Sequence, residues 1–301
     1  MKQHAGHSHA PRGDGDSRRL SIALALILGF MAVEVAAGIV VSSLALISDA
    51  AHMLTDAGAL ALSLVVIRLM RRPAEGNLTF GLRRTEILSA QANGVLLLVL
   101  ALLIMYEAIR RLIAPLDAGG MTMLVVALAG IVVNLVATRQ LAGADRSSMN
   151  VEGSFQHLLT DLLAFVLTAV AGVVILATGF NRADGIASLV IAAIMLRAAY
   201  GLLRDSGRVL LEAAPEGMDA ALIGRALASH PHVVNVHDLH VWQIGSGFPA
   251  LSAHVLVAPE DDCHAVRREL ETLLASEFGI SHTTLQVEHE TAGRLLTIGG
   301  D

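Results

Sequence analysis

Six long apolar runs restrict the folds that this 301-residue chain can adopt. They cover roughly Leu20–Val41, Leu44–Leu69, Glu86–Leu112, Met121–Leu141, Val151–Thr178 and Asp184–Leu203. A helix of about 20 apolar residues crosses a bilayer, and each run reaches that length. Hydrophobic residues make up 54% of the chain and charged residues 16%, which is more apolar than a soluble domain requires. We therefore predict a membrane domain, an all-α bundle of six helices over residues 20–205.

The distribution of Lys and Arg predicts how this bundle is oriented. If both termini are cytoplasmic, the inner segments hold Lys2, Arg12, Arg18, Arg19, Arg71, Arg72, Arg83, Arg84, Arg146 and Arg208, and the outer connections hold Arg110, Arg111 and Arg182. Cytoplasmic loops carry the excess of positive charge. We expect a multi-pass protein of the cytoplasmic (inner) membrane with both ends inside. Residues 1–19 then form a histidine-bearing cytosolic tail, without the pattern of a cleavable signal peptide.

Residues 206–301 are polar and have short alternating segments, as expected for a cytosolic domain. The pattern predicts helices near Met218–Ser229 and Cys263–Phe278 and strands near Val233–Ile244, Ala250–Ala258 and Thr283–His289. This α-β-β-α-β order suits a small α+β domain with its helices on one face of the sheet. The domain carries 13 acidic and 5 basic side chains, which favours cations and argues against nucleic acid as a partner.

Two of the apolar runs contain the same ionisable pair, His-x-x-x-Asp, as His52 with Asp56 and His157 with Asp161. Residues four apart share one face of a helix, so each pair presents an imidazole and a carboxylate together. Ionisable groups inside a membrane are costly and usually functional. Two such faces brought opposite each other would supply four ligands in a tetrahedral site for a divalent metal ion, with zinc as the natural guest.

The charges of these four ligands indicate what the site binds and how it releases it. Two carboxylates and two neutral imidazoles carry a net charge of −2, which a divalent cation neutralises. Mixed nitrogen and oxygen ligands suit zinc, cobalt, cadmium and nickel better than magnesium or calcium, and affinity alone does not choose among them. Because a metal binds only the neutral imidazole, protons compete with it. Exchange of metal for protons follows from that competition, with alternating access by helix rocking.

Several motifs together resemble the cation diffusion facilitator family over nearly the whole chain. They are Ser43-Leu-Ala-Leu-Ile-Ser-Asp-Ala-Ala-His-Met-Leu-Thr-Asp56, Thr79-Phe-Gly81 with Arg84 and Glu86-Ile-Leu, Gln156-His-Leu-Leu-Thr-Asp161, Val236-His-Asp-Leu-His-Val-Trp242 and Leu251-Ser-Ala-His254. The resemblance implies a homodimeric zinc exporter of bacterial type that exchanges a cytosolic divalent cation for protons. It further implies a ferredoxin-like, metallochaperone-like cytosolic domain. It assigns the transport site to His52, Asp56, His157 and Asp161.

The resemblance also points to cytosolic metal sites. His237, His254 and His289 match positions where family members bind regulatory metal, and His264 is a further candidate. Zinc is thus expected both as the transported ion and as a regulatory ion, and the transporter could also export cadmium and cobalt. No organic cofactor is expected. His4, His7 and His9 could collect metal, although a short histidine-bearing tail binds metals only weakly. Asp49 shares the face of His52 and Asp56, as a ligand or as a structural partner.

Two other functions compete with transport. One is an intramembrane metalloenzyme in which the metal activates water. Against it, His-Glu-x-x-His is absent from the sequence and four protein ligands leave no open position for water, so we expect no enzyme. The other is a membrane zinc sensor that binds metal in the cytosolic domain and signals without transport. Zinc accumulation in sealed vesicles separates these three functions.

Overall fold

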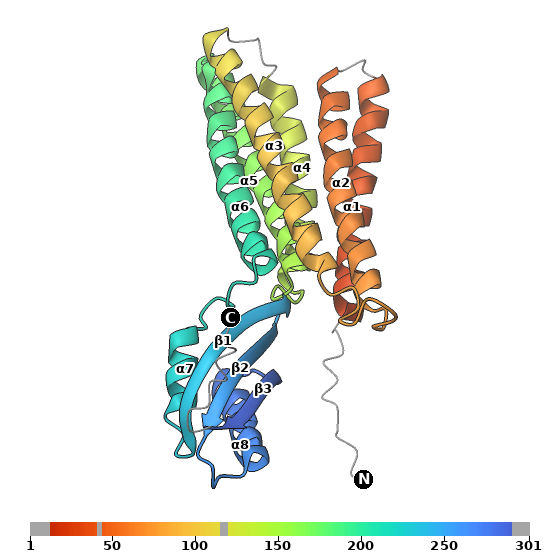
Figure 1. The fold of residues 1–301 in the computed structure, drawn as a ribbon. Coiled ribbons are helices and arrows are strands. Elements are labelled where there is room, and N and C mark those ends of the chain that lie inside the picture. The colour runs from red at the N-terminus through yellow and green to blue at the C-terminus, as the bar shows by residue number, and fades with distance from the viewer. Residues whose placement is uncertain (1–12, 41–43, 115–119, 291–301) are drawn as a thin grey trace, which may run out of the picture. The chain divides into compact units, whose positions relative to one another are not determined.

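The computed structural model describes residues 13–40, 44–114 and 120–290, and for residues 13–14 and 44–52 it describes the backbone alone. The chain divides into two compact units, Met1–Gly207 and Arg208–Asp301. The composition predicts the boundary two residues earlier, after residue 205. The first unit is helical, and the second combines helices with a small sheet (Figure 1).

Within the described residues, six helices are long and apolar enough to cross a membrane. They are α1 (Gly13–Val40), α2 (Leu44–Met70), α3 (Thr85–Ile113), α4 (Gly120–Ala142), α5 (Met149–Thr178) and α6 (Arg182–Leu210). All six correspond to the predicted runs. The main differences are that α1 begins at Gly13 and α6 continues to Leu210, each about two turns beyond its apolar run. An apolar run marks the part of a helix that lies in lipid, whereas polar residues can continue the same helix into water.

Helix α5 is central to the packing of this unit, because it contacts α2, α3 and α4. Its first half joins a core that also includes α1, α2 and α4, with Leu20, Leu60, Leu141 and Leu158 fully buried. Small residues allow close helix approach. Gly130 of α4 lies against the ring of Phe165, where an added Cβ would be 2.5 Å from ring atoms. The core therefore packs α5 against α2, and the glycine lets α4 approach α5 closely.

The outer surface of the helical unit is apolar. Large side chains such as Val33, Leu103, Val132 and Tyr200 are more than half exposed. A surface of this kind would cause a soluble protein to aggregate. It is the surface expected where helices face lipid, and the chain is therefore a multi-pass membrane protein.

The second unit contains α7 (Ala220–Ala228), β1 (Val233–Gly245), β2 (Phe248–Val257), α8 (Cys263–Phe278) and β3 (His282–His289). This confirms the predicted α-β-β-α-β order. The sheet order is β1-β2-β3, with β1 antiparallel and β3 parallel to β2. Alternate residues of β2, Leu251 to Val257, are buried against Leu227 of α7 and Leu270 of α8. The opposite face of the sheet carries no helix among the described residues.

Candidate metal centre

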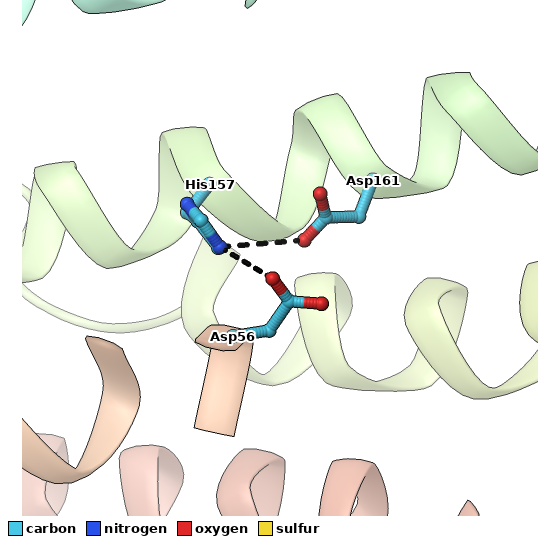
Figure 2. Close-up of side chains that lie close together, drawn as sticks. All are labelled: Asp56, His157 and Asp161. Carbon is cyan, nitrogen blue, oxygen red and sulfur yellow. Dashed lines mark hydrogen bonds and ion pairs between the residues drawn. The ribbon is translucent and has the colours of Figure 1, made fainter. Parts of the chain in front are cut away.

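Three of the four predicted ligands lie together between α2 and α5. The Nε2 atom of His157 is 2.8 Å from Oδ1 of Asp56 and 3.9 Å from Oδ2 of Asp161. Figure 2 shows the imidazole and one carboxylate on α5 and the second carboxylate reaching them from α2. One ligand atom from each residue lies within 4.8 Å of the other two, so these atoms could hold a single metal ion.

The position of His157 follows from its helix. His157 and Asp161 are four residues apart and share the face of α5 that meets α2. The histidine is only 1% exposed, whereas the carboxylates of Asp56 and Asp161 keep 14% and 17% of their side-chain surface exposed. The imidazole is thus held inside the protein, and the two carboxylates are more accessible than it is.

The electrostatics of this cluster favour a divalent cation. Two carboxylates so close together repel each other in a medium of low dielectric constant. A neutral imidazole with two carboxylates carries a charge of −2, and an ion of charge +2 cancels it. Binding requires Nε2 of His157 to give up any proton that it shares with Asp56, because a metal binds the same lone pair. Nδ1 of His157 has no hydrogen-bond partner in the described part of the chain.

His52, the fourth predicted ligand, lies in α2 one turn before Asp56. Its side chain is outside the described residues, and so is that of Asp49. Helical spacing places His52 on the same side of α2 as Asp56, so its role stays a prediction.

Further polar side chains line the interface of α2 and α5, toward the start of α5 from the cluster. The sequence analysis did not identify them. The hydroxyls of Ser63 on α2 and Ser154 on α5 are 2.6 Å apart, and Asn150 donates to the carbonyl oxygen of Ser63 at 3.0 Å. All three residues are fully buried. A signal was available, because Ser63 and Ser154 lie seven residues from Asp56 and Asp161 respectively, on the same helix faces.

The start of α5 is held by a second group of contacts. Arg146 bonds both carboxylate oxygens of Glu152, at 2.7 and 3.1 Å, and its guanidinium lies 3.9 Å from the centre of the Phe155 ring. Hydrogen bonding to Glu152 raises the pKa of Arg146 above its usual value. These contacts orient the first two turns of α5, which immediately precede His157.

In the second unit, the structure brings His237 and His254 together. They are cross-strand neighbours on β1 and β2, and their ring centroids are 5.2 Å apart. Asp238 lies beside them in the left-handed region, with φ of 51° at an irregularity in β1. Its carboxylate is 3.9 Å from Nε2 of His254 and 2.9 Å from Nε2 of His240. Asp238 and His240 lie within the motif Val236–Trp242 but were not among the predicted ligands.

The other two candidate histidines lie elsewhere. His254 pairs with Gln286 in the β2–β3 register, whereas His289 pairs with Val257 three positions further along. Side chains alternate between faces, so His289 points to the helix-covered face of Val257 and His254 to the opposite face. His264 is exposed in the first turn of α8. The structure therefore does not bring His264 or His289 to the pair of His237 and His254.

Family models match almost the whole chain. Residues 20–211 match the cation efflux transmembrane domain, and residues 215–290 match the cytoplasmic domain of cation efflux proteins. The chain belongs to the cation diffusion facilitator family. This membership places it among cation efflux proteins of the membrane, which are transporters and not in general enzymes.

Bacterial relatives cover this cation diffusion facilitator nearly end to end. The cation efflux system protein CzcD of Alcaligenes sp. is 41% identical over 94% of this chain and 90% of its own length. The zinc transporter ZitB of Shigella flexneri is 38% identical, and a cadmium, cobalt and zinc/H(+)-K(+) antiporter of Bacillus subtilis is 37% identical, each over 95% of this chain and 92% of its own. A solved metal-bound C-terminal domain of CzcD from Cupriavidus metallidurans is 35% identical over 24% of this chain and 99% of its own, with a TM-score of 0.23.

Proposed function

We propose that this cation diffusion facilitator exports zinc from the cytoplasm in exchange for protons. The ion binds between α2 and α5, on His52, Asp56, His157 and Asp161. The observation that carries the proposal is the cluster of Asp56, His157 and Asp161, which places two carboxylates around one buried imidazole inside a membrane domain. The names of relatives that transport zinc, cadmium and cobalt support the same class of ion.

Proton coupling follows from the contact between His157 and Asp56. At 2.8 Å the imidazole and carboxylate share a proton when no metal is bound. Zinc takes the place of that proton, and a proton arriving from the other side of the membrane displaces zinc. Each transport cycle then carries metal one way and protons the other. The relative named as a cadmium, cobalt and zinc/H(+)-K(+) antiporter supports exchange of metal for protons.

The proposed orientation puts both termini and the second unit in the cytoplasm. The match of residues 215–290 to a cytoplasmic domain and the Lys and Arg bias of the loops both support it. In this orientation, His237, His254 and Asp238 meet cytosolic zinc before the transport site does. We assign them to regulation, in a homodimer of the inner membrane, because metal bound there would favour one arrangement of two paired domains.

Flux into sealed vesicles tests the transport site. Purified protein is reconstituted, a proton gradient is imposed, and zinc accumulation is followed with a trapped fluorescent indicator. Asp56→Asn and Asp161→Asn remove charge with little change of volume, and each should reduce accumulation to the level of protein-free vesicles. An ionophore that collapses the proton gradient should also stop uphill accumulation by the unchanged protein.

Glu107→Gln is the matched control, because Glu107 is an exposed carboxylate that pairs with Arg110 within α3. It should transport zinc like the unchanged protein. Normal accumulation by both aspartate variants would remove the proposed site, whereas zinc accumulation that ignores the ionophore would remove the coupling and leave the site. A protein that binds zinc but accumulates none would point to the sensor.

A further inference from the structure

Metal-ligating side chains also gather at one corner of the second unit, away from the sites described so far. Three segments meet there: the loop before β1, the loop before α8 and the end of β3. A backbone hydrogen bond of 2.8 Å from Glu290 to Val257 holds the end of β3 to the end of β2. We call His232, Asp261, Cys263 and His289 the corner cluster.

Asp261 connects the two histidines of this cluster. Its carboxylate oxygen Oδ1 is 2.8 Å from Nδ1 of His232, and its carbonyl oxygen is 2.9 Å from Nε2 of His289. The same Nε2 atom is 3.4 Å from Sγ of Cys263. A sulfur, two imidazoles and a carboxylate thus lie along one chain of contacts.

The spacing of Cys263 and His289 fits a shared metal ion. Zinc binds sulfur at about 2.3 Å and imidazole nitrogen at about 2.0 Å, so two ligands at a tetrahedral angle lie about 3.5 Å apart. The observed 3.4 Å between Sγ and Nε2 matches that separation. To bind the ion, Nε2 of His289 must release its proton and exchange its hydrogen bond to the carbonyl oxygen of Asp261 for the metal. Asp261 is positioned to orient His232 as a carboxylate orients a metal-bound imidazole, leaving Nε2 of His232 for the ion.

The corner cluster is separate from His237 and His254. Those histidines lie on the open face of the sheet, whereas His289 points to the face covered by α8, whose first residue is Cys263. The side chains of His232 and His289 are exposed and Cys263 is half-buried, so an ion in solution can reach them.

We propose that the corner cluster is a second cytosolic metal site, with Cys263 and His289 as its first two ligands, His232 closing on the ion and Asp261 orienting His232. Its ligand set includes a thiolate, which selects zinc, cadmium and cobalt over manganese and magnesium. A bound ion would join the end of β3 to the start of α8. The site goes beyond the transport function, because it involves neither α2 nor α5.

Cobalt tests this site directly because Cys263 is the only cysteine in the chain. Cobalt(II) bound to a thiolate gives a charge-transfer band in the near ultraviolet that nitrogen and oxygen ligands do not give. Full-length protein titrated with cobalt should show the band. Cys263→Ser should abolish it, and His232→Ala should weaken cobalt binding about tenfold. Asp161→Asn should retain it, which separates this proposal from the transport site.

Alkylation of the single thiol gives a second measurement that does not depend on cobalt. Zinc should slow the reaction of Cys263 with iodoacetamide about tenfold or more in the unchanged protein, because a metal-bound thiolate is a poor nucleophile. His289→Ala should remove this protection. His282→Ala is the matched control, an exposed histidine at the other end of β3, and should keep it. Absence of the cobalt band, or an alkylation rate that zinc leaves unchanged, would overturn the proposal.

Discussion

At the scale of single residues, the cluster depends on one imidazole that contacts carboxylates from two helices. His157 is buried, and its Nε2 atom points at Asp56 across the helix interface and at Asp161 along its own helix. Movement of α2 relative to α5 therefore changes the distance from His157 to Asp56 but leaves the distance to Asp161 set by the helix. A site divided in this way can be assembled and opened by one helix displacement, which is what alternating access needs.

The buried hydroxyls of Ser63 and Ser154 should stabilise the interface between α2 and α5. Ser154→Ala removes the partner of Ser63 and leaves a buried hydroxyl on α2 without an acceptor from α5. We expect the free energy of unfolding to fall by about 1 to 3 kcal/mol, the cost of an unsatisfied buried polar group. Reversible unfolding in mixed detergent micelles measures it.

Ser206→Ala provides the comparison for that measurement. Ser206 is equally buried, but within the described residues its hydroxyl donates only to carbonyl oxygens of its own helix, those of Leu202 and Leu203. Its removal leaves no donor unsatisfied, so it should cost less than about 1 kcal/mol. Equal losses for the two variants would show that the contact between Ser63 and Ser154 contributes nothing special to the interface.

The candidate residues could be picked out from the sequence, but the way in which the structure groups them could not. The His-x-x-x-Asp spacing identified His157 and Asp161 because helix geometry alone brings them together. The contact between His157 and Asp56 depends on how α2 and α5 pack, which their spacing does not encode. Similarly, the family resemblance named His289 together with His254 as candidate regulatory ligands, but the parallel register of β2 and β3 puts the two on opposite faces of the sheet. In both cases the sequence did not show how segments far apart in the chain pack or pair with each other.

At the scale of elements, apolar length predicted the helices well and their ends less well. The polar residues that begin α1 and end α6 lie outside the apolar runs, where only capping and neighbouring contacts decide how far a helix continues. Helix α8 has a clear start, because Asp262 accepts hydrogen bonds from the backbone N–H groups of His264 and Ala265 at 2.8 and 3.2 Å. These bonds hold the pKa of Asp262 below its ordinary value of 3.8.

The cap of α8 makes a pH-dependent contribution that can be tested. Since the pKa of Asp262 is lowered by folding, its stabilisation is complete above its ordinary value of 3.8 and is lost as pH falls through the folded value. Asp262→Ala should lower the melting temperature of the second unit by a few degrees at neutral pH, and this difference should shrink in acid. Fluorescence of Trp242, the single tryptophan, reports this unit.

Asp219→Ala is a useful companion to that experiment, because Asp219 caps α7 with one hydrogen bond, to Ala221. It should show a smaller loss of melting temperature. A difference between the unchanged protein and Asp262→Ala that stays constant down to acid pH would mean that the charge of Asp262 does not stabilise α8.

At the scale of the whole molecule, the chain is two units with different tasks. The helical unit holds the three described ligands of the candidate transport site, and the α+β unit holds two groups of ligands near its surface. The second unit has an excess of negative charge, which attracts cations. The candidate ligands of this unit are exposed or half-buried, so ions in solution can reach them. The ligands of the helical unit are more deeply buried, as suits an ion in transit.

This division predicts that the second unit adjusts transport without carrying the ion. Replacing His237 and His254 together by alanine removes both imidazoles beside Asp238, so zinc can no longer favour one arrangement of the cytosolic domains. In proteoliposomes, the zinc concentration that gives half-maximal flux should shift about fivefold or more, while the maximal rate is largely kept. The exposed His282, which lies on another strand, serves as the control: His282→Ala should leave the zinc dependence unchanged. Loss of a regulatory ion changes the balance between transport states but leaves the site in the membrane intact. If the double variant inserts normally but transports no zinc at any concentration, the two histidines therefore belong to the transport path itself.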